Sequence, residues 1–343
     1  MRRLVWEGGS RFSLQEVRPP EAPLAGRVRV RVRAVGVCGT DIHILSGEFP
    51  LARPPLVLGH EIAGEIDAVG EGVERVRPGD RVTVDQVIGC GACFFCHRGS
   101  RQFCENGYEM GITADGGSQD FIELPESNVY PIPDTISFEE AAILDMEVYG
   151  ALKKGGVGPG DVVAVFGHGP AGLVACQEAR ALGAARVILC GRSRARLQGA
   201  RTIGVADRYL SAEESNVVEA IRAETGGRGA DVAVECAGSP RSIADAIQAT
   251  VAGGRVVLYG IQNRPVPNFD LDAVVLKDLT IYGSIADRVG WEEVIDLAHT
   301  GRLRLGPLIT HRFPLEAAPA AYDLVRRRAE GVIKAVLVLA LRP

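Results

Sequence analysis

Four cysteines form the densest group of reactive side chains in this sequence. Cys90, Cys93 and Cys96 lie in the stretch CGACFFC, and Cys104 follows after seven further residues. Four thiolates at this spacing can close a tetrahedral shell around Zn²⁺, which leaves no open position for chemistry. The spacing therefore predicts a structural zinc site, with an iron–sulfur cluster or unligated surface cysteines as the alternatives. His97 lies in the same segment, but four cysteines already fill the shell, so we expect this histidine to face solvent.

A second group of metal-ligand residue types is spread more widely along the chain. The stretch VCGTDIH (37–43) contains Cys38, and LGHEIAGEI (58–66) contains His60 and Glu61. A zinc site with three protein ligands of these types keeps one position open for water or substrate. Taken alone, a cysteine and a histidine at this separation could equally well be core residues.

Two further carboxylates lie in an apolar run. The stretch ILDMEVYG (143–150) places Asp145 and Glu147 among hydrophobic residues. A buried carboxylate is costly unless it is paired, protonated or bound to a metal. The run therefore raises the question of whether one of these acids is a metal ligand.

A glycine-rich turn indicates a nucleotide site. GHGPAG (167–172) fits G-x-G-x-x-G, follows the apolar run DVVAVF (161–166) and precedes a segment of helical periodicity. The first glycine permits a tight turn, the second the close approach of a pyrophosphate, and the third close packing of helix on strand. The helix N-terminus then presents amides to the phosphates. The residues expected to contact the cofactor here are Gly167, Gly169, Pro170, Ala171 and Gly172.

The choice of cofactor depends on the end of the next strand. An NAD site places an acidic residue about 20 positions after the turn, where it binds the ribose. Here the strand RVILC is followed by Gly191, Arg192, Ser193 and Arg194. A glycine leaves room for a 2′-phosphate, which serine and arginine can bind. We therefore expect NADP(H) to be favoured over NAD(H); the alternative is that these arginines are solvated and the cofactor is NAD.

The elements that must position these groups fall into two regions. Up to about residue 148 the segments alternate or are β-branched, as in 27–37 and 61–70, which is typical of antiparallel strands. Beyond about residue 160, short apolar runs alternate with helical stretches, which predicts an α/β fold with a doubly wound parallel sheet.

Composition sets further bounds. The 343 residues include 38 basic and 43 acidic side chains, a net charge of −5, which gives no signal for nucleic acid or an anionic membrane. Neither a signal peptide nor a run of about 18 apolar residues is present. In a reducing compartment, clustered cysteines suggest a metal site rather than disulfides. We expect a cytoplasmic protein.

The order of these motifs resembles that of a known family. GVCGTDIHILSG, GHEIAGEI, the four cysteines and GHGPAG occur as in the zinc-dependent medium-chain dehydrogenases of the alcohol dehydrogenase superfamily, nearest in style to the sorbitol, threonine and secondary-alcohol branches. The resemblance covers nearly the whole chain. It implies a β-rich GroES-like catalytic domain (1–148) with a structural zinc lobe (about 88–106), a Rossmann domain (149–286), and a segment (287–343) that completes both. It also implies two zinc ions per chain and a homodimer or homotetramer.

The same resemblance assigns roles to individual residues. Cys38 and His60 match ligands of a catalytic zinc. Thr40 matches the hydroxyl that hydrogen-bonds the substrate alcohol, and His43 matches the imidazole that relays its proton toward solvent. Asp41 would orient the His60 ring or the loop, unless it only stabilises the turn.

The third ligand departs from the family pattern. The usual distance to the glycine-rich turn falls on Ile143, which cannot bind metal. The local pattern acid-x-x-x-x-Gly instead gives Asp145 and Gly150, and it requires a two-residue deletion in the following segment. We therefore predict Asp145 as the ligand, with Glu147 as an alternative. Glu61, which matches a carboxylate beside the metal that can coordinate transiently, is a further alternative.

Other matches concern the nicotinamide half of the cofactor. Backbone groups of Ala237 and Gly238, and of Tyr259 and Gly260, match positions that hold the carboxamide. Lys334 matches a basic position close to the cofactor in some relatives, or is a surface lysine.

The implied activity is reversible hydride transfer between NADP(H) and a secondary alcohol or ketone of a polyol, sugar, cyclitol or amino alcohol. The alternatives are an NAD-dependent threonine- or sorbitol-type dehydrogenase and a non-catalytic zinc- and nucleotide-binding protein. A metal-free quinone reductase of the same superfamily would lack both zinc motifs. The sequence leaves the substrate and the direction open, although NADP favours reduction, and it places the substrate pocket near residues 44–50, 109–115 and 261–287.

Overall fold

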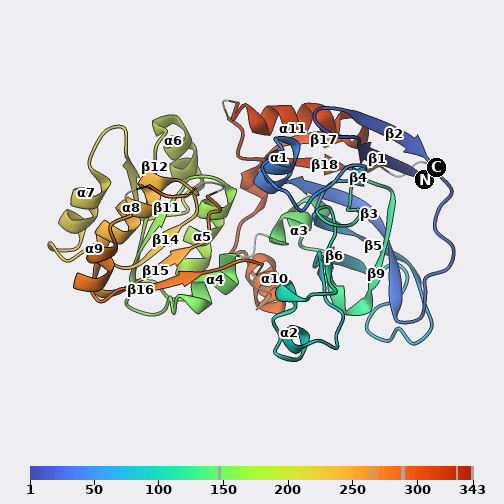
Figure 1. Ribbon diagram of the computed structural model, residues 1–343, viewed down its shortest axis with the longest axis horizontal. Helices are drawn as coiled ribbons and strands as arrows, with labels where there is room; N and C mark the ends of the chain where they lie inside the picture. Colours follow the sequence, from blue (N-terminus) through green and yellow to red (C-terminus); the bar gives the residue numbers. More distant parts are fainter. Residues whose placement is uncertain (146–147, 263–264, 268, 287–289, 330, 341–343) are drawn as a thin grey trace. The chain divides into compact units, whose positions relative to one another are not determined.

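The computed structural model describes residues 1–145, 148–262, 265–267, 269–286, 290–329 and 331–340. The chain forms two compact units (Figure 1): Met1–Asp145 with Leu305–Pro343, and Met146–Arg304. Within the described ranges, no helix has both the length and the apolar character needed to cross a membrane.

The first unit is built on a largely antiparallel sheet whose central strand is β3 (Arg27–Val37). In the sequence RVRVRVRAVGV the valines are buried and the arginines only partly exposed, so one face packs into the core. The strand order is β10-β6-β5-β3-β18-β17, and β9 also pairs with β3. The partner strands are β5 (Glu61–Val69), β6 (Arg81–Val84), β9 (Phe121–Pro125), β10 (Val129–Pro131), β17 (Ile309–Pro314) and β18 (Lys334–Val338).

Smaller elements surround this sheet. Helix α11 (Ala318–Arg326) packs on β18 and β3, and α1 (Gly39–Leu45) packs on α11. Two further small sheets are formed by β1 (Arg2–Trp6), β2 (Phe12–Glu16) and β4 (Leu56–Val57), and by β7 (Val87–Ile88) and β8 (Tyr108–Glu109). The helices are α1 (Gly39–Leu45), α2 (Phe94–His97), α3 (Phe138–Ala142) and α11 (Ala318–Arg326), and the 3-10 turns are η1 (Arg101–Phe103), η2 (Glu126–Asn128), η3 (Ile143–Asp145), η4 (Gly306–Leu308) and η5 (Leu315–Ala317).

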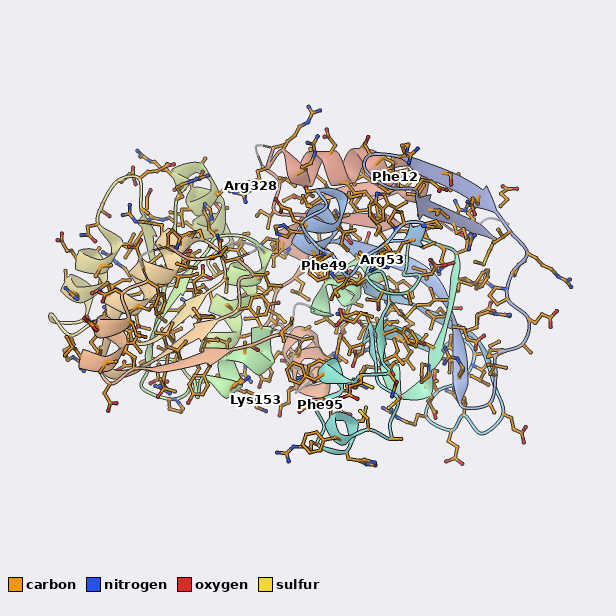
Figure 2. The ribbon with its side chains drawn as sticks, viewed as in Figure 1. Phe12, Phe49, Arg53, Phe95, Lys153 and Arg328 are labelled. Carbon is orange, nitrogen blue, oxygen red and sulfur yellow. The ribbon has the colours of Figure 1, made fainter. Side chains whose placement is uncertain are left out.

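Aromatic stacking joins the N-terminal strands to the C-terminal helix. The Phe12 ring, labelled in Figure 2, stacks on Tyr322 of α11 with centroids 5.6 Å apart and planes 14° from parallel. Tyr322 belongs to the buried core of this unit. Residues more than 300 positions apart in the sequence therefore share one hydrophobic cluster.

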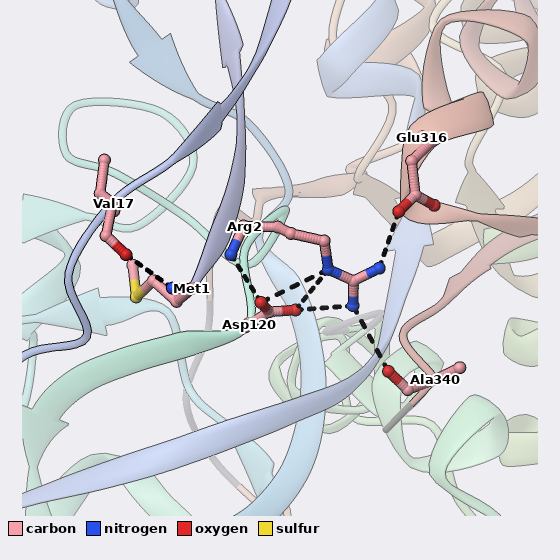
Figure 3. A network of polar contacts seen from close by, with 6 residues as sticks. All are labelled: Met1, Arg2, Val17, Asp120, Glu316 and Ala340. Atoms are coloured by element: carbon pink, nitrogen blue, oxygen red, sulfur yellow. Dashed lines mark hydrogen bonds and ion pairs between the residues drawn. The ribbon is translucent and has the colours of Figure 1, made fainter. Parts of the chain in front are cut away.

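Arg2 makes a polar connection between the same two ends (Figure 3). Its side chain, 9% exposed, donates to Asp120 Oδ1 at 2.8 Å and to Glu316 Oε1 at 2.7 Å. A further bond reaches the backbone oxygen of Ala340 at 3.3 Å. One guanidinium thus joins β1, the start of β9 and the C-terminal segment.

The second unit is a Rossmann fold. Six parallel strands lie in the order β13-β12-β11-β14-β15-β16, which is 3-2-1-4-5-6 in chain order. The strands are β11 (Val162–Phe166), β12 (Arg186–Gly191), β13 (Arg208–Ser211), β14 (Ala230–Glu235), β15 (Thr250–Leu258) and β16 (Thr280–Gly283). The helices are α4 (Val148–Lys154), α5 (Pro170–Ala181), α6 (Arg194–Ile203), α7 (Val217–Glu224), α8 (Pro240–Ala249), α9 (Leu271–Leu276) and α10 (Trp291–His299). The predicted α/β fold, with its doubly wound parallel sheet and β-rich companion, is confirmed.

The Arg2 connection gives a stability prediction. Arg2→Met removes the counter-charge of Asp120, which is itself only 21% exposed, so we expect the free energy of unfolding to fall by about 2–3 kcal/mol. Arg3→Met is the matched control, because Arg3 is 34% exposed and lies 3.7 Å from Asp115; it should cost at most about 0.5 kcal/mol. Equal losses in denaturant titrations of the two variants would contradict the structural role of Arg2.

Candidate active site

The loop after β3 presents Cys38. Cys38 is the N-cap of α1, and its backbone N–H donates to Asp41 Oδ2 at 2.9 Å. Asp41 is fully buried, so the carboxylate that closes this turn is held in the core. The turn is therefore rigid at the residue that carries the thiol.

His60 and Glu61 lie where β5 begins, opposite the end of β3. The preceding Gly59 has φ of +94°, a conformation that favours glycine. Gly36 of β3 pairs with Glu61, and a Cβ at Gly36 would lie 1.8 Å from Glu61 Oε2, so the glycine makes room for the carboxylate. One donor atom from each of Cys38, His60 and Glu61 lies within 4.8 Å of the others. We call these three residues the ligand cluster.

Lys334, the first residue of β18, faces this cluster. Its ammonium lies 2.6 Å from Glu61 Oε1, and the two side chains are 3% and 2% exposed. Burial disfavours the ammonium, but the charges of Glu61, Cys38 and Asp41 and the hydrogen bond to Glu61 together outweigh that effect and raise the pKa of Lys334. The alternative of a surface lysine is therefore wrong.

The ligand cluster fits a divalent cation. Nδ1 of His60 lies 3.6 Å from Asp41 Oδ1, too far for a hydrogen bond. Burial disfavours the imidazolium, yet the negative charges of Cys38 and Asp41 raise the pKa of His60 well above its usual value. Among the described residues, Glu61 Oε2 and His60 Nδ1 have no hydrogen-bond partner although both are buried. A thiolate, an imidazole and a carboxylate with unused lone pairs are zinc-binding chemistry.

The predicted third ligand is described only in its backbone. Asp145 ends η3, which packs against β5, the strand that begins with Glu61. Glu147 lies outside the described residues.

Helix α1 carries the two residues expected to handle the substrate proton, and one of them, Thr40, lies beside the ligand cluster. Thr40 Oγ1 is 3.7 Å from Cys38 Sγ. The His43 ring, 41% exposed, has its Nδ1 2.8 Å from Glu48 Oε2. Sequence reasoning did not single out Glu48, and no local pattern marks it. Thr40 and His43 are three residues apart on one helix and so lie on the same side of it.

The cysteine lobe brings its four sulfur atoms together. One sulfur from each of Cys90, Cys93, Cys96 and Cys104 lies within 4.8 Å of the others, and those of Cys93 and Cys104 are 3.7 Å apart. A tetrahedral zinc site with Zn–S bonds of about 2.3 Å requires sulfur separations of about 3.8 Å. Backbone amides lower the pKa of Cys90 and of Cys93, which favours the thiolate, whereas burial raises the pKa of Cys96 to about 11. The four cysteines thus fit a closed zinc shell.

The surroundings of the lobe agree with this geometry. His97 is exposed and lies outside the group of converging sulfur atoms, as expected. Phe95, labelled in Figure 2, packs edge-on against Phe103 with centroids 5.9 Å apart. Arg101 of η1 pairs with the fully buried Asp85, which anchors the lobe to the end of β6.

The glycine-rich turn has the shape that a pyrophosphate needs. Gly167 has φ of +128°, and a Cβ at Gly172 would lie 1.7 Å from Gly167 O, so helix and turn touch. A Cβ at Gly169 would have nothing within 4 Å, which leaves open space at the N-cap of α5. Pro170 is the first residue of that helix, followed by Ala171. The turn fits a dinucleotide.

Beyond β12 the predicted cofactor residues differ in their environments. Gly191 ends the strand, and Ser193 caps α6 by accepting from Arg196 N. Arg192 is exposed, whereas Arg194 pairs with Glu214 at 3.0 Å. No carboxylate of the described residues lies within ion-pair distance of Arg192. Its guanidinium is available to an anion.

Glu235 organises the ends of β14 and β15, a role that sequence reasoning missed. Its buried carboxylate accepts from Ala237 N at 2.8 Å and Gly238 N at 3.0 Å, and its backbone oxygen accepts from Tyr259 N and Gly260 N at 2.9 Å. The sequence did carry one signal for this role, which is an acidic residue at the end of an otherwise apolar strand. The two strand ends that match the nicotinamide half are thus held together by one residue.

A unit with a zinc-binding ligand cluster and a Rossmann unit with a phosphate-binding turn define a class: zinc- and nucleotide-dependent oxidoreductases. Two family models match the chain, the alcohol dehydrogenase GroES-like domain over residues 24–134 and the zinc-binding dehydrogenase over residues 170–300.

Individual relatives belong to the same family as the two matching models. The L-threonine 3-dehydrogenase of Bacillus licheniformis is 34% identical over 91% of each chain. The sorbitol dehydrogenase of Halalkalibacterium halodurans is 30% identical over 93% of this chain and 94% of its own. The solved alcohol dehydrogenase TADH from Thermus sp. ATN1 is 34% identical with a TM-score of 0.90, covering 99% of this chain and 100% of that one. The chain belongs to the zinc-dependent medium-chain alcohol dehydrogenases, as the motif order predicted.

The Glu61–Lys334 pair gives a second prediction. Lys334→Met should cost about 3–5 kcal/mol of unfolding free energy, because it leaves Glu61 buried without a counter-charge. Adding Glu61→Gln should restore most of that loss, since an amide needs no counter-charge. Chemical denaturation of the two single variants and the double variant measures this coupling. Additive losses would show that the two groups do not stabilise each other.

Proposed function

We propose that this chain catalyses reversible hydride transfer between NADP(H) and a secondary alcohol or ketone of a polyol, sugar, cyclitol or amino alcohol. The observation that carries the proposal is the convergence of Cys38, His60 and Glu61 within 4.8 Å, beside the Thr40 hydroxyl. Relatives whose names specify threonine and sorbitol support a hydroxyl-bearing carbon with polar neighbours. An NAD-dependent threonine- or sorbitol-type dehydrogenase is the second candidate, favoured by those same relatives.

In this proposal Cys38, His60 and Asp145 hold the catalytic zinc, Glu61 lies beside it as a carboxylate that could coordinate transiently, and the glycine-rich turn holds the nucleotide. When bound, the metal supplies a Lewis acid and the nicotinamide a hydride acceptor. The Thr40 hydroxyl accepts a hydrogen bond from the substrate hydroxyl. As Thr40 takes up the substrate proton, it gives its own hydroxyl proton to His43. The His43 ring is partly exposed and bonded to Glu48, so the proton leaves toward solvent there. Asp41 acts indirectly, by holding the Cys38 turn and facing the His60 ring.

The second zinc, bound by Cys90, Cys93, Cys96 and Cys104, is structural in this proposal. No thiolate of the shell remains free, so it offers substrate no position. It stabilises the lobe rather than taking part in the reaction.

Self-association is also part of the proposal. Helix α9 exposes Leu271, Val275 and Leu276 at 62%, 69% and 85%, and β16 is the last strand of its sheet. Exposed apolar side chains, and a strand at the edge of its sheet among the described residues, each favour pairing of two chains into a homodimer or homotetramer. The cytoplasm is the proposed compartment, because none of the eight cysteines is in a disulfide and the zinc-binding cysteines must stay reduced.

Loss of the third ligand should remove the catalytic zinc and leave the structural zinc in place. Asp145→Ala is expected to lower zinc from two to one per chain and to abolish turnover, because two protein ligands hold zinc poorly. Asp134→Ala, at a side chain that is 98% exposed, is the control and should keep both ions. Metal analysis of the purified chains gives the count. Two zinc ions with full turnover in Asp145→Ala would reject Asp145 as the ligand.

The activity itself is tested with a panel of polyols, amino alcohols and cyclitols and their ketones, each with both cofactors. We expect kcat/KM to be at least about tenfold higher with NADP(H), because the end of β12 offers Gly191 and the Arg192 guanidinium and no acid. Solved relatives from Escherichia coli and Sinorhizobium meliloti are bound to NADH and NADP respectively, so the family accommodates both. A clear preference for NAD would favour the second candidate. A chain with two zinc ions and no turnover on any panel member would favour a non-catalytic binding protein.

A further inference from the structure

His168 links the glycine-rich turn to the end of β12. The residue lies between Gly167 and Gly169, and its Nε2 accepts a hydrogen bond from the backbone N–H of Ser193 at 3.1 Å. Its ring lies over Gly191, where a Cβ would come within 2.6 Å of both Cγ and Cδ2. We call His168 together with residues 191–193 the ribose corner.

Gly191 is therefore required for space and not for backbone conformation. It is absent from the glycines with positive φ, so an L-residue could adopt this backbone. What excludes a larger residue is the imidazole ring, whose Cγ is close to the backbone and cannot move aside as the tip of a long side chain could. Position 191 is also where a Rossmann fold that binds NAD carries its ribose-binding acid. The ring of His168 occupies the volume that such an acid would need.

The hydrogen-bonding groups of the ribose corner, like its shape, disfavour the ribose diol of NAD. Because Nε2 accepts from Ser193, the neutral ring carries its proton on Nδ1 and has no second acceptor to offer. Arg192 contributes only donors, and Arg194 is paired with Glu214. Binding a ribose diol requires acceptors, whereas a 2′-phosphate presents oxygens that need donors. The corner is thus suited to an oxyanion.

We propose that His168 is the residue that determines cofactor choice in this chain: it excludes an acid from position 191 and holds residues 191–193 so that the corner accepts a 2′-phosphate. The inference rests on the NADP preference proposed above. His168 acts as a specificity-determining and positioning residue, and the hydride-transfer chemistry does not depend on it.

The test uses the full zinc-loaded chain and two nucleotide fragments, adenosine 2′,5′-bisphosphate and adenosine 5′-monophosphate, with calorimetric Kd as the readout. We expect the natural chain to bind the bisphosphate at least about tenfold more tightly. His168→Ala should reduce that ratio by about tenfold, because Ser193 N–H loses its acceptor and the loop loses its support. His299→Ala, at an exposed histidine of the same unit, is the matched control and should leave the ratio unchanged.

Position 191 supplies the decisive comparison. Gly191→Asp alone should weaken both fragments, because the new side chain and the imidazole compete for one volume. The double variant His168→Ala/Gly191→Asp should bind the monophosphate at least about tenfold more tightly than Gly191→Asp does, and should no longer favour the bisphosphate. Thermal unfolding with and without each fragment gives a second readout, since a bound fragment raises Tm in a folded chain.

The outcomes separate the inference from the proposed function. Equal binding of the two fragments by the natural chain would reject the NADP preference. A natural preference for the bisphosphate that persists in His168→Ala would overturn the role of His168 and leave the NADP preference standing. Tight monophosphate binding by Gly191→Asp with His168 in place would overturn the steric exclusion.

Discussion

The buried ion pair between Glu61 and Lys334 is the constraint on which the first unit depends. Strand β3 runs between β5 and β18, so the two charges meet at the end of the strand that leads to Cys38. Any shift in the pairing of these strands would bury a carboxylate or an ammonium alone, at a cost of several kcal/mol. The pair thus ties strand register to the position of the ligand cluster, and Gly36 gives the carboxylate its space.

The two units build their binding sites from different groups, side chains in the first unit and mainly backbone in the second. The first places charged and metal-binding side chains at a strand end that is held by buried polar contacts, such as Asp41 on the Cys38 turn. The second uses backbone and empty space: the open volume at Gly169 and the amides of Ala237 and Gly238, which Glu235 orients. Zinc needs side-chain lone pairs, whereas a dinucleotide phosphate needs N–H donors at a helix terminus. Each unit therefore presents the chemistry of its own ligand.

Local pattern accounts for what the sequence could predict. The alternation of β3, the apolar strands of the second unit and the spacing of the four lobe cysteines are each local patterns in the sequence. Fold class and cysteine lobe therefore follow from them. Strand β13 could not be recognised from the sequence, because RYLS is a short edge strand with few apolar residues. Lys334 was ambiguous because its partner lies 273 residues away, although a lysine opening an apolar strand was a hint. The His168 ring over Gly191 depends on how turn and strand end pack, which no local spacing encodes.

The return of the C-terminal segment to the first unit has a consequence for synthesis on the ribosome. The second unit is continuous in sequence, so it can fold as soon as residue 304 has emerged. The first unit cannot: β3 lacks its neighbour β18, and Glu61 lacks its counter-charge, until residues 334–338 have been translated. The unit that begins synthesis first is completed last, and the Glu61–Lys334 pair beside the ligand cluster forms only in a nearly full-length chain.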